Sequence, residues 1–329
     1  MQIRGGGART RGPKDLRRVG DVDHDPLRDL PMTASDTDRD GPARSDPGLL
    51  DRLIADPTTR VIELRGGSAP LRLEGGLSRR PPGPADAHSL LLYLGRQDGE
   101  SLVAACYPEE PGPPKDREER LDEAPFVSLR QVAADLAPEE AAHFATALGL
   151  SNWHARHRFC PRCGAETEVV QAGWMRRCPR DGSEHYPRTD PAVIVAVTDA
   201  EDRLLLGRNV GWPEGRFSVL AGFVEPGETI EAAVVREVHE ETAVVVTDVE
   251  FVADQPWPFP ASLMLGCTAR ATTTEIICQP DEIAEARWFT REEFRAEVAA
   301  GRVKAAGRLS IAARLVESWL GERLDRLGA

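Results

Sequence analysis

Apolar and polar positions alternate in short runs along residues 49–135, and Gly- and Pro-rich turns separate these runs. This pattern is typical of β-strands joined by tight turns. We expect strands at 61–64, 71–73, 89–94 and 101–106. A longer apolar stretch at 138–148, opened by Pro138, predicts a helix. Residues 49–152 are therefore predicted to form a small α+β domain.

The second half of the chain has more strongly apolar runs. Strands are expected at 192–197, 203–206, 249–253, 263–270 and 286–289. Ile311, Leu315 and Trp319 recur at helical spacing, which predicts a final amphipathic helix over 308–325. Residues 189–329 are predicted to form a second, larger domain of mixed helices and strands.

Residues 1–48 have a different composition. They contain nine Asp, nine Lys or Arg, seven Gly and five Pro, with no aromatic residue. Such a segment has too little apolar surface to offset the entropy lost on ordering, so we expect it to be disordered. Met32 lies inside it and is a candidate translation start.

Composition narrows the class of protein. The chain has 329 residues, 41% of them hydrophobic and 29% charged, and its net charge is −13. This is typical of a soluble protein of two or three domains, and no apolar run approaches the length of a membrane span. The negative charge argues against non-specific nucleic-acid binding. Of the six cysteines, three have metal-site spacing and three are scattered, which favours a reducing cytoplasm.

The most informative segment is acidic. Glu228 precedes a predicted helix on which Glu237, Glu240 and Glu241 share one face. Like charges at this spacing repel, and their oxygen atoms suit Mg²⁺ or Mn²⁺. The alternative is a solvated acidic helix face. That alternative is disfavoured because apolar residues interleave with the acids, at Ile230, Val234 and Val238.

This segment carries a family resemblance. The pattern runs from Gly222 through Glu228 and Arg236 to Glu241, and it closes on Ala243 and an apolar residue. It resembles the Nudix box of the Nudix hydrolases, except that the family has Gly where this chain has Ala243. The resemblance implies an α/β/α sandwich with a mixed sheet, and metal-dependent hydrolysis of a nucleoside diphosphate linked to another group.

Three cysteines lie between the two predicted domains, in residues 153–188. Cys160-x2-Cys163 and Cys178-x2-Asp181 have the spacing of a zinc ribbon whose fourth Cys is replaced by Asp. Asp181 can complete a Zn²⁺ site; His185 and the more distant His157 are alternative ligands. A metal-free ribbon is the other interpretation. The ribbon also carries a candidate basic patch, formed by Arg176, Arg177 and Arg180.

A second motif narrows the substrate. Gln255-Pro-Trp-Pro-Phe-Pro-Ala-Ser262 closely resembles the motif of the NAD(H) pyrophosphatase subfamily. Its prolines restrict the backbone, and Trp257 and Phe259 are suited to stacking on planar rings. The alternative is a structural Pro-rich loop, expected to lie between strands. Asp254 stands where the subfamily pattern has Ser.

The resemblance covers residues 50–325 and implies roles for individual residues. Glu237, Glu241 and Glu282 would bind the catalytic metal together with Glu240, and Glu240 or Glu241 would activate water. Arg236 would pair with a carboxylate such as Glu228. Substrate contacts are implied for Tyr186, Ala221, Gly222, Phe223, Gln255, Pro256, Trp257, Pro258, Phe259, Pro260, Ala261, Ser262 and Ala312. A homodimer is implied as well.

The predicted reaction is hydrolysis of NAD(H) to AMP and NMN(H), with removal of NAD caps from RNA as a second activity. A Nudix enzyme acting on ADP-ribose or a diadenosine polyphosphate is the principal alternative. A non-catalytic nucleotide sensor is disfavoured because the acids are kept. A nucleic-acid-binding zinc module is disfavoured by the incomplete ribbon and the negative charge.

Overall fold

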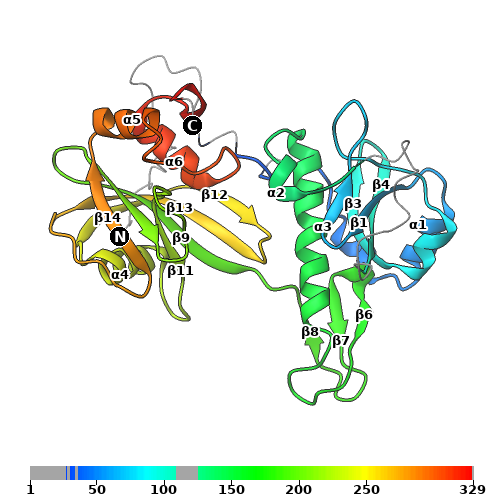
Figure 1. Cartoon of the computed structure of the whole chain (residues 1–329). Coiled ribbons are helices and arrows are strands. Elements are labelled where there is room, and N and C mark those ends of the chain that lie inside the picture. Colours follow the sequence, from blue (N-terminus) through cyan, green and yellow to red (C-terminus); the bar gives the residue numbers. More distant parts are fainter. Residues whose placement is uncertain (1–26, 28–29, 34–35, 109–124, 328–329) are drawn as a thin grey trace, which may run out of the picture.

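The computed structural model describes residues 27, 30–33, 36–108 and 125–327. Figure 1 shows two sheet-containing bodies, with the long helix α3 (Pro138–Arg156) beside the first and a narrow three-stranded module projecting below it. Helix α3 continues past residue 152, where the sequence predicts a domain boundary. No helix among the described residues is long and apolar enough to cross a bilayer.

The N-terminal body is a five-stranded sheet in the order β3-β4-β1-β2-β5. Its elements in chain order are α1 (Leu49–Ala55), β1 (Arg60–Arg65), β2 (Ser68–Pro70), β3 (Leu90–Gln97), β4 (Glu100–Tyr107), β5 (Phe126–Ser128) and α2 (Leu129–Val132). Strands β1 and β4 are parallel and the other pairs are antiparallel. Helix α3 packs its Ala141, Phe144 and Ala147 into the core of this sheet.

The predicted disorder of residues 1–48 is wrong for the part that the structure describes. Leu30 and Met32 are buried, each in a different one of the two main bodies. Asp38 exchanges two backbone hydrogen bonds with Arg96, of 2.9 and 2.7 Å, and Gly95 has no side chain to block that approach. A few apolar anchors and an exposed sheet edge therefore order a segment whose average composition favours disorder. Residues 1–26, 28–29 and 34–35 lie outside the described residues.

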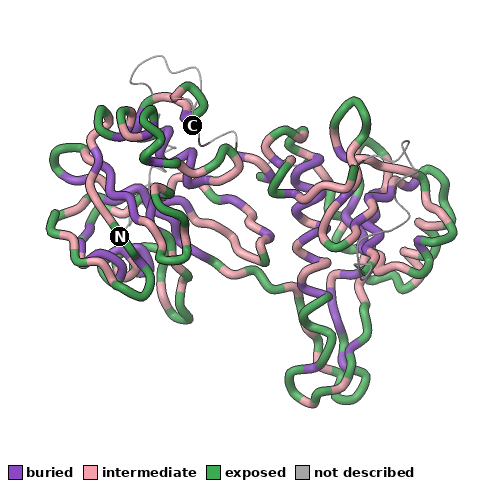
Figure 2. The backbone as a smooth tube through the Cα atoms, in the orientation of Figure 1, coloured by how far each residue is buried: buried purple, intermediate pink, exposed green. Residues whose placement is uncertain are grey.

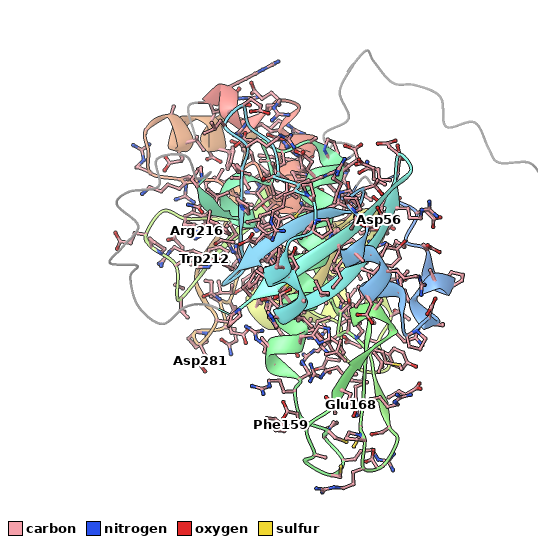
Figure 3. The ribbon with its side chains drawn as sticks, turned by 90° about the vertical axis from the view of Figure 1, so that its right-hand side faces the viewer. Asp56, Phe159, Glu168, Trp212, Arg216 and Asp281 are labelled. Carbon is pink, nitrogen blue, oxygen red and sulfur yellow. The ribbon has the colours of Figure 1, made fainter. Side chains whose placement is uncertain are left out.

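The projecting module is a three-stranded antiparallel sheet. It consists of β6 (Glu168–Val170), β7 (Met175–Arg177) and β8 (Glu184–His185). Phe159 and Glu168 mark it in Figure 3, below the rest of the chain. Its sheet is too small to bury a core of its own, and Ala172, between β6 and β7, packs against Tyr93 and Val103 of the N-terminal sheet.

The C-terminal body is an α/β/α sandwich, as the family resemblance predicts. Its six-stranded mixed sheet has the order β12-β13-β9-β10-β14, and β11 pairs with β9. The strands are β9 (Asp190–Thr198), β10 (Leu204–Asn209), β11 (Leu220–Phe223), β12 (Val246–Trp257), β13 (Ser262–Ala271) and β14 (Ile283–Phe289). Buried segments concentrate in its centre (Figure 2).

Alternate residues along the central strand β9 pack on opposite faces of the sheet. Val193, Val195 and Val197 of β9 pack with α4 (Ile230–Thr242), whereas Ile194 and Ala196 pack toward α5 (Arg291–Ala299) and α6 (Ile311–Leu320). The period of two explains why β9 is almost continuously apolar, because both of its faces are covered.

Three element predictions differ from the structure. Residues 71–73 form no strand, and Leu73 is 85% exposed. Helix α3 extends past residue 148 to Arg156, because its second half packs beside the ribbon. The last helix is shorter than expected: it ends at Leu320, where Gly321 adopts a left-handed conformation.

Candidate functional site

The acidic helix α4 is positioned by its cap and its apolar face. The Thr229 hydroxyl accepts a hydrogen bond from the Ala232 amide at 3.2 Å, which satisfies one free donor of the first turn. Val234 and Val238 are fully buried against the sheet. The acids on the adjacent face are thereby fixed at the edge of the sheet beside β11.

Arg236 organises the carboxylates around it. Its guanidinium donates to both oxygens of Glu228, at 2.7 and 2.8 Å, which confirms the predicted pairing. It also lies 2.9 Å from Glu237 and 3.0 Å from Glu240, and it donates to the Phe223 carbonyl at 2.9 Å. The Arg236 hydrogen bonds are the main cause that lowers the pKa of Glu228 to about 2. The loop before α4 is therefore tied to the helix by one side chain.

Glu241 has the opposite environment. It is 8% exposed, and its Oε2 has no hydrogen-bond partner among the described residues. Burial, and then the charges of Glu237 and Glu282, raise the pKa of Glu241 to about 8. Burial also raises the pKa of Glu237. A buried oxygen without a partner, repelled by two nearby acids, fits a divalent cation, which would satisfy the oxygen and remove the repulsion.

Two backbone positions shape this cluster. A Cβ at Gly222 would lie 1.9 Å from the carboxyl carbon of Glu237, so no side chain fits there without displacing that acid. At the other end of α4, Ala243 caps the helix with φ 58°, in the left-handed region. The chain thus adopts the conformation for which the family uses Gly, at a cost of about 1 kcal/mol for the Ala side chain.

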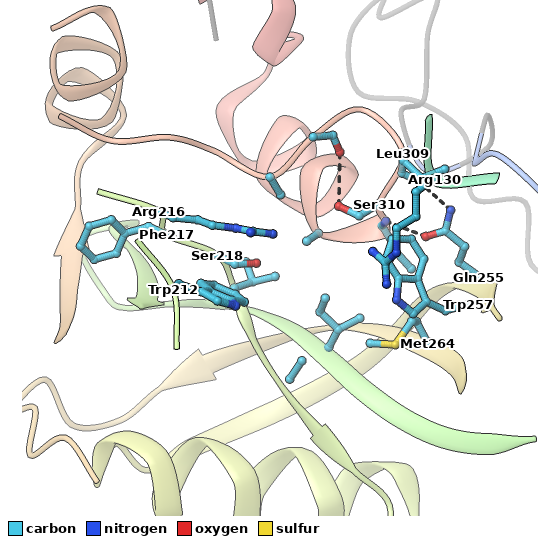
Figure 4. Close-up of a pocket in the computed structure, with 17 residues that line it drawn as sticks. Arg130, Trp212, Arg216, Phe217, Ser218, Gln255, Trp257, Met264, Leu309 and Ser310 are labelled. Carbon is cyan, nitrogen blue, oxygen red and sulfur yellow. Dashed lines mark hydrogen bonds between the residues drawn. The ribbon is translucent and has the colours of Figure 1, made fainter. Parts of the chain in front are cut away.

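A cavity of about 340 Å³ lies on the other face of the sheet, between β9, β11, β13 and the start of α6 (Figure 4). Four of the predicted substrate residues line it, namely Ala221, Gln255, Trp257 and Ala312. Neighbouring residues of β11 thus serve both sites, since Ala221 lines the cavity and Gly222 lies against Glu237. The cavity and the carboxylates therefore lie on opposite faces of β11.

Gln255 is held by the protein itself. It is completely buried, and its amide nitrogen donates to the carbonyls of Pro31 at 3.1 Å and Leu309 at 2.8 Å. Its amide oxygen accepts from the backbone of Ile311, the first residue of α6, at 2.8 Å. Both amide hydrogens are used, so Gln255 joins β12 to two distant segments at the cavity wall, at Pro31 and at residues 309–311.

The rest of the second motif forms a hairpin rather than an isolated loop. Gln255 to Trp257 end β12, Ser262 begins β13, and Asn152 of α3 donates to the carbonyls of Pro258 and Pro260. Trp257 and Phe259 contact edge to face, with ring centres 5.1 Å apart. A second hollow, of about 240 Å³, is lined by four further motif residues, Pro256, Pro258, Ala261 and Ser262.

Five implied substrate residues lie outside both hollows: Gly222, Phe223, Tyr186, Phe259 and Pro260. Gly222 contacts Glu237 as described, and Phe223 is 58% exposed. Tyr186 lines a separate hollow near the ribbon, where its hydroxyl donates to Glu184 at 2.6 Å.

The ribbon brings its predicted ligands together. The ligand atoms all lie within 4.8 Å of one another, from Cys160, Cys163, Cys178 and Asp181. The Ser183 hydroxyl, 3.4 Å from the Cys160 sulfur, is the main cause that lowers the pKa of that thiol to about 6. His185 bonds to Ser183, and His157 bonds to the Trp153 carbonyl. The donor set of three sulfurs and a carboxylate fits a zinc ion.

The predicted basic patch on the ribbon is wrong in one member. Arg176 is buried, and it donates to Thr167 at 2.6 Å and contacts His154 at 3.0 Å. Arg180 donates to the Cys163 carbonyl at 3.1 Å. Arg176 is therefore a structural residue that connects α3 with the ribbon.

Sequence reasoning missed three residues at the cavity: Arg130, Trp212 and Arg216. Trp212 and Arg216 flank the Pro-Glu-Gly turn before β11. An aromatic residue and an arginine on either side of a turn, close in sequence to the Nudix box, are a signal that could have indicated them. Arg130 comes from the N-terminal body, and no local pattern connects it with this site.

Comparisons with known proteins agree with this organisation. Residues 188–308 match the NUDIX domain, residues 155–186 the NADH pyrophosphatase zinc ribbon domain, and residues 58–153 the NADH pyrophosphatase-like rudimentary NUDIX domain. The NAD-capped RNA hydrolase NudC of Mycobacterium bovis is 39% identical over 318 residues, covering 92% of this chain and 94% of the relative. The NudC of Mycobacterium tuberculosis has the same identity and coverage. The human NAD-capped RNA hydrolase NUDT12 is 39% identical over 248 residues, covering 70% of this chain and 54% of the relative.

The left-handed Ala243 predicts a stabilising substitution. Ala243→Gly should raise the free energy of unfolding by about 0.5–1 kcal/mol, because glycine adopts this conformation without Cβ strain. Ala232→Gly, at an exposed position inside the same helix, should lower it by about 1 kcal/mol. Chemical denaturation of both variants measures the difference, and a destabilised Ala243→Gly protein would contradict the assigned strain.

The Gln255 contacts predict a large loss of stability. Gln255→Glu keeps the size of the side chain but places a carboxylate against two carbonyl oxygens, so the free energy of unfolding should fall by roughly 3 kcal/mol or more. Gln97→Glu is the matched control, because Gln97 accepts from Arg79 and a carboxylate suits that contact. Equal stability of the two variants would contradict the internal role of Gln255.

The raised pKa of Glu241 predicts that metal binding releases a proton. With its pKa raised to about 8, this carboxyl is mostly protonated at pH 7 when no cation is bound, and a cation that binds there must displace the proton. Titration calorimetry with Mg²⁺ or Mn²⁺ at pH 7, in two buffers of different ionisation enthalpy, should show about one proton released per chain. Glu241→Gln should abolish that release, and heats independent of the buffer would contradict the assignment.

Proposed function

The chain belongs to the Nudix hydrolases, in the NAD(H) pyrophosphatase and NAD-capped RNA hydrolase subfamily, and from this membership we propose that it hydrolyses the diphosphate bond of NAD(H) to AMP and NMN(H). One observation carries the proposal, and it concerns two neighbouring residues of β11. Ala221 lines a cavity with aromatic walls, and Gly222 lies against Glu237 of the acidic cluster. A dinucleotide needs both features, a pocket for a ring and a cation site for its diphosphate.

We assign the catalytic cation to Glu237 and Glu241, with Glu240 and Glu282 around them. A divalent ion, Mg²⁺ or Mn²⁺, would supply charge neutralisation for the diphosphate and a lower pKa for water. The buried Glu241 oxygen and the mutual repulsion of Glu237, Glu241 and Glu282 support this assignment.

The chain's own residues then have distinct tasks. Water attacks one phosphorus atom, the bond from that phosphorus to the bridging oxygen breaks, and the proton of the water passes to a carboxylate. Glu240 and Glu241 are the two candidate bases: Glu240 is ion-paired with Arg236 at 3.0 Å, whereas Glu241 has an oxygen without a hydrogen-bond partner among the described residues. Arg236 orients the loop and helix through Glu228 and the Phe223 carbonyl, and it is a positioning residue.

Removal of NAD caps from RNA is the second proposed activity. Relatives 39% identical to this chain are named NAD-capped RNA hydrolases, and the bond cleaved is the same diphosphate bond. The net charge of −13 requires that RNA be recognised by local positive charge rather than by the chain as a whole.

Three further properties are proposed with this function. Zn²⁺ in the ribbon is supported by the cluster of three cysteines and Asp181. A cytoplasmic location is supported by the absence of disulfides, since all six cysteines are free. A homodimer rests on the family resemblance, and light scattering of the purified protein measures it directly.

Product analysis tests the function. Incubation of the purified protein with NADH and Mg²⁺ or Mn²⁺ should yield AMP and reduced NMN, separated by chromatography. Glu241→Gln should lower turnover by about two to four orders of magnitude, because it removes a carboxylate that acts in the reaction. Glu231→Gln, in the exposed first turn of the same helix, is the matched control and should retain turnover.

Parallel incubations with ADP-ribose and diadenosine diphosphate identify the alternative substrates. Faster cleavage of either compound than of NADH would overturn NAD(H) as the substrate while keeping the reaction type. Full turnover in Glu241→Gln would remove Glu241 from catalysis.

A further inference from the structure

Two arginines lie on opposite rims of the cavity, each stacked on an aromatic residue (Figure 4). The Arg216 guanidinium carbon lies 4.8 Å from the centre of the Trp212 ring. The Arg130 guanidinium carbon lies 3.9 Å from the Phe259 ring centre and 5.3 Å from that of Trp257. Arg130 belongs to α2 of the N-terminal body and Arg216 to the turn before β11, so the two main bodies each contribute one cation to the cavity.

The positive charge at this rim lacks a counter-charge within the described part of the chain. There, no carboxylate forms an ion pair with Arg130 or Arg216, whereas Arg236 contacts three acids. Burial, followed by the charge of Arg216, lowers the pKa of Arg130. Two guanidinium groups that repel each other across a cavity mouth are stabilised together by an anion between them.

The position of this rim separates it from the cation site. Leu220 and Gly222 of β11 face α4 and the acidic cluster, whereas Ala221 faces the cavity. A diphosphate held by the acids of α4 therefore lies on the other side of β11 from the two arginines. A nucleoside attached to that diphosphate would reach the cavity with its base between the aromatic walls, formed by Trp212 and Trp257, and its ribose would then face the rim.

We propose that Arg130 and Arg216 together bind a phosphate carried on the ribose of the nucleoside in the cavity, at its 2′ or 3′ oxygen. This inference rests on the proposed function and adds a specificity determinant to it. The ligand chemistry is a ribose phosphate beyond the diphosphate, and it has two sources. A 2′-phosphate belongs to a phosphorylated dinucleotide, and a 3′-phosphodiester is the first linkage of an RNA strand joined to the dinucleotide.

Nucleotide binding tests the proposal without requiring turnover. The full-length protein is titrated by calorimetry with AMP, 2′,5′-ADP and 3′,5′-ADP, without added divalent metal. One bisphosphate should bind at least about tenfold more tightly than AMP, because charged hydrogen bonds of this kind change affinity roughly ten- to hundredfold. A 2′ preference identifies the phosphorylated dinucleotide as the source, a 3′ preference identifies RNA, and either supports the proposal.

Variants of the two arginines test whether these residues bind the ribose phosphate. Arg216→Met and Arg130→Met should each reduce the ratio of bisphosphate to AMP affinity by roughly ten- to hundredfold. Arg216→Lys keeps the charge but loses the planar fork, so it should give a smaller reduction in the same ratio. Arg156→Met removes an exposed arginine at the end of α3 and is the matched control, whose ratio should equal that of the wild type.

Three results would overturn the inference. These are equal wild-type affinity for all three nucleotides, a ratio that survives in both methionine variants, and an equal loss of affinity for AMP and the bisphosphates. The last result would place the 5′-phosphate at the arginines instead. Failure of the proposed function is seen separately, as absence of NADH cleavage by the same preparation.

Discussion

Mutual repulsion among the carboxylates of α4 is the constraint on which the rest of the site depends. Glu237 and Glu241 are four residues apart on one helix face, and Glu282 adds its charge from the residue before β14. The protein keeps these acids close by burying the opposite face of α4 and by placing Arg236 among their neighbours. Gly222 has no side chain, and this leaves room for the Glu237 carboxylate. This repulsion lowers the local stability of the fold, and a cation bound between the carboxylates would restore it.

Local signals were sufficient to predict most of the helix and sheet framework of the sandwich. The period of the apolar residues predicts α4, β9, β10, β12, β13 and β14 but not β11 or α5, and the spacing of the cysteines predicts which side chains meet in the ribbon. These predictions succeeded because the partners lie close in sequence, or because both faces of a strand are covered. The 71–73 strand prediction failed because a run as short as Leu71-Arg-Leu73 has too few residues to distinguish a strand from a turn.

Contacts between distant segments could not be predicted in this way. The motif around Gln255 indicated a substrate contact, whereas its amide joins Pro31, Leu309 and Ile311. Arg130 approaches Phe259 from another body, and neither sequence neighbourhood encodes the pairing. Such contacts depend on how whole units pack, which periodicity and spacing do not specify. The acidic residues of the site can therefore be predicted from the sequence, whereas most residues that line the cavity cannot.

The segment at residues 30–33 has a practical consequence for any study of isolated parts of this enzyme. Leu30 fills the core of the C-terminal body, Met32 fills that of the N-terminal body, and Pro31 between them accepts a hydrogen bond from Gln255. A fragment cut to the recognisable domains would lack all three residues and would leave a buried amide hydrogen unpaired beside the cavity. Kinetic measurements on such a fragment, and its crystal structures, would report a cavity that lacks these contacts. Proteins prepared for ligand screens should therefore include residues 30–33.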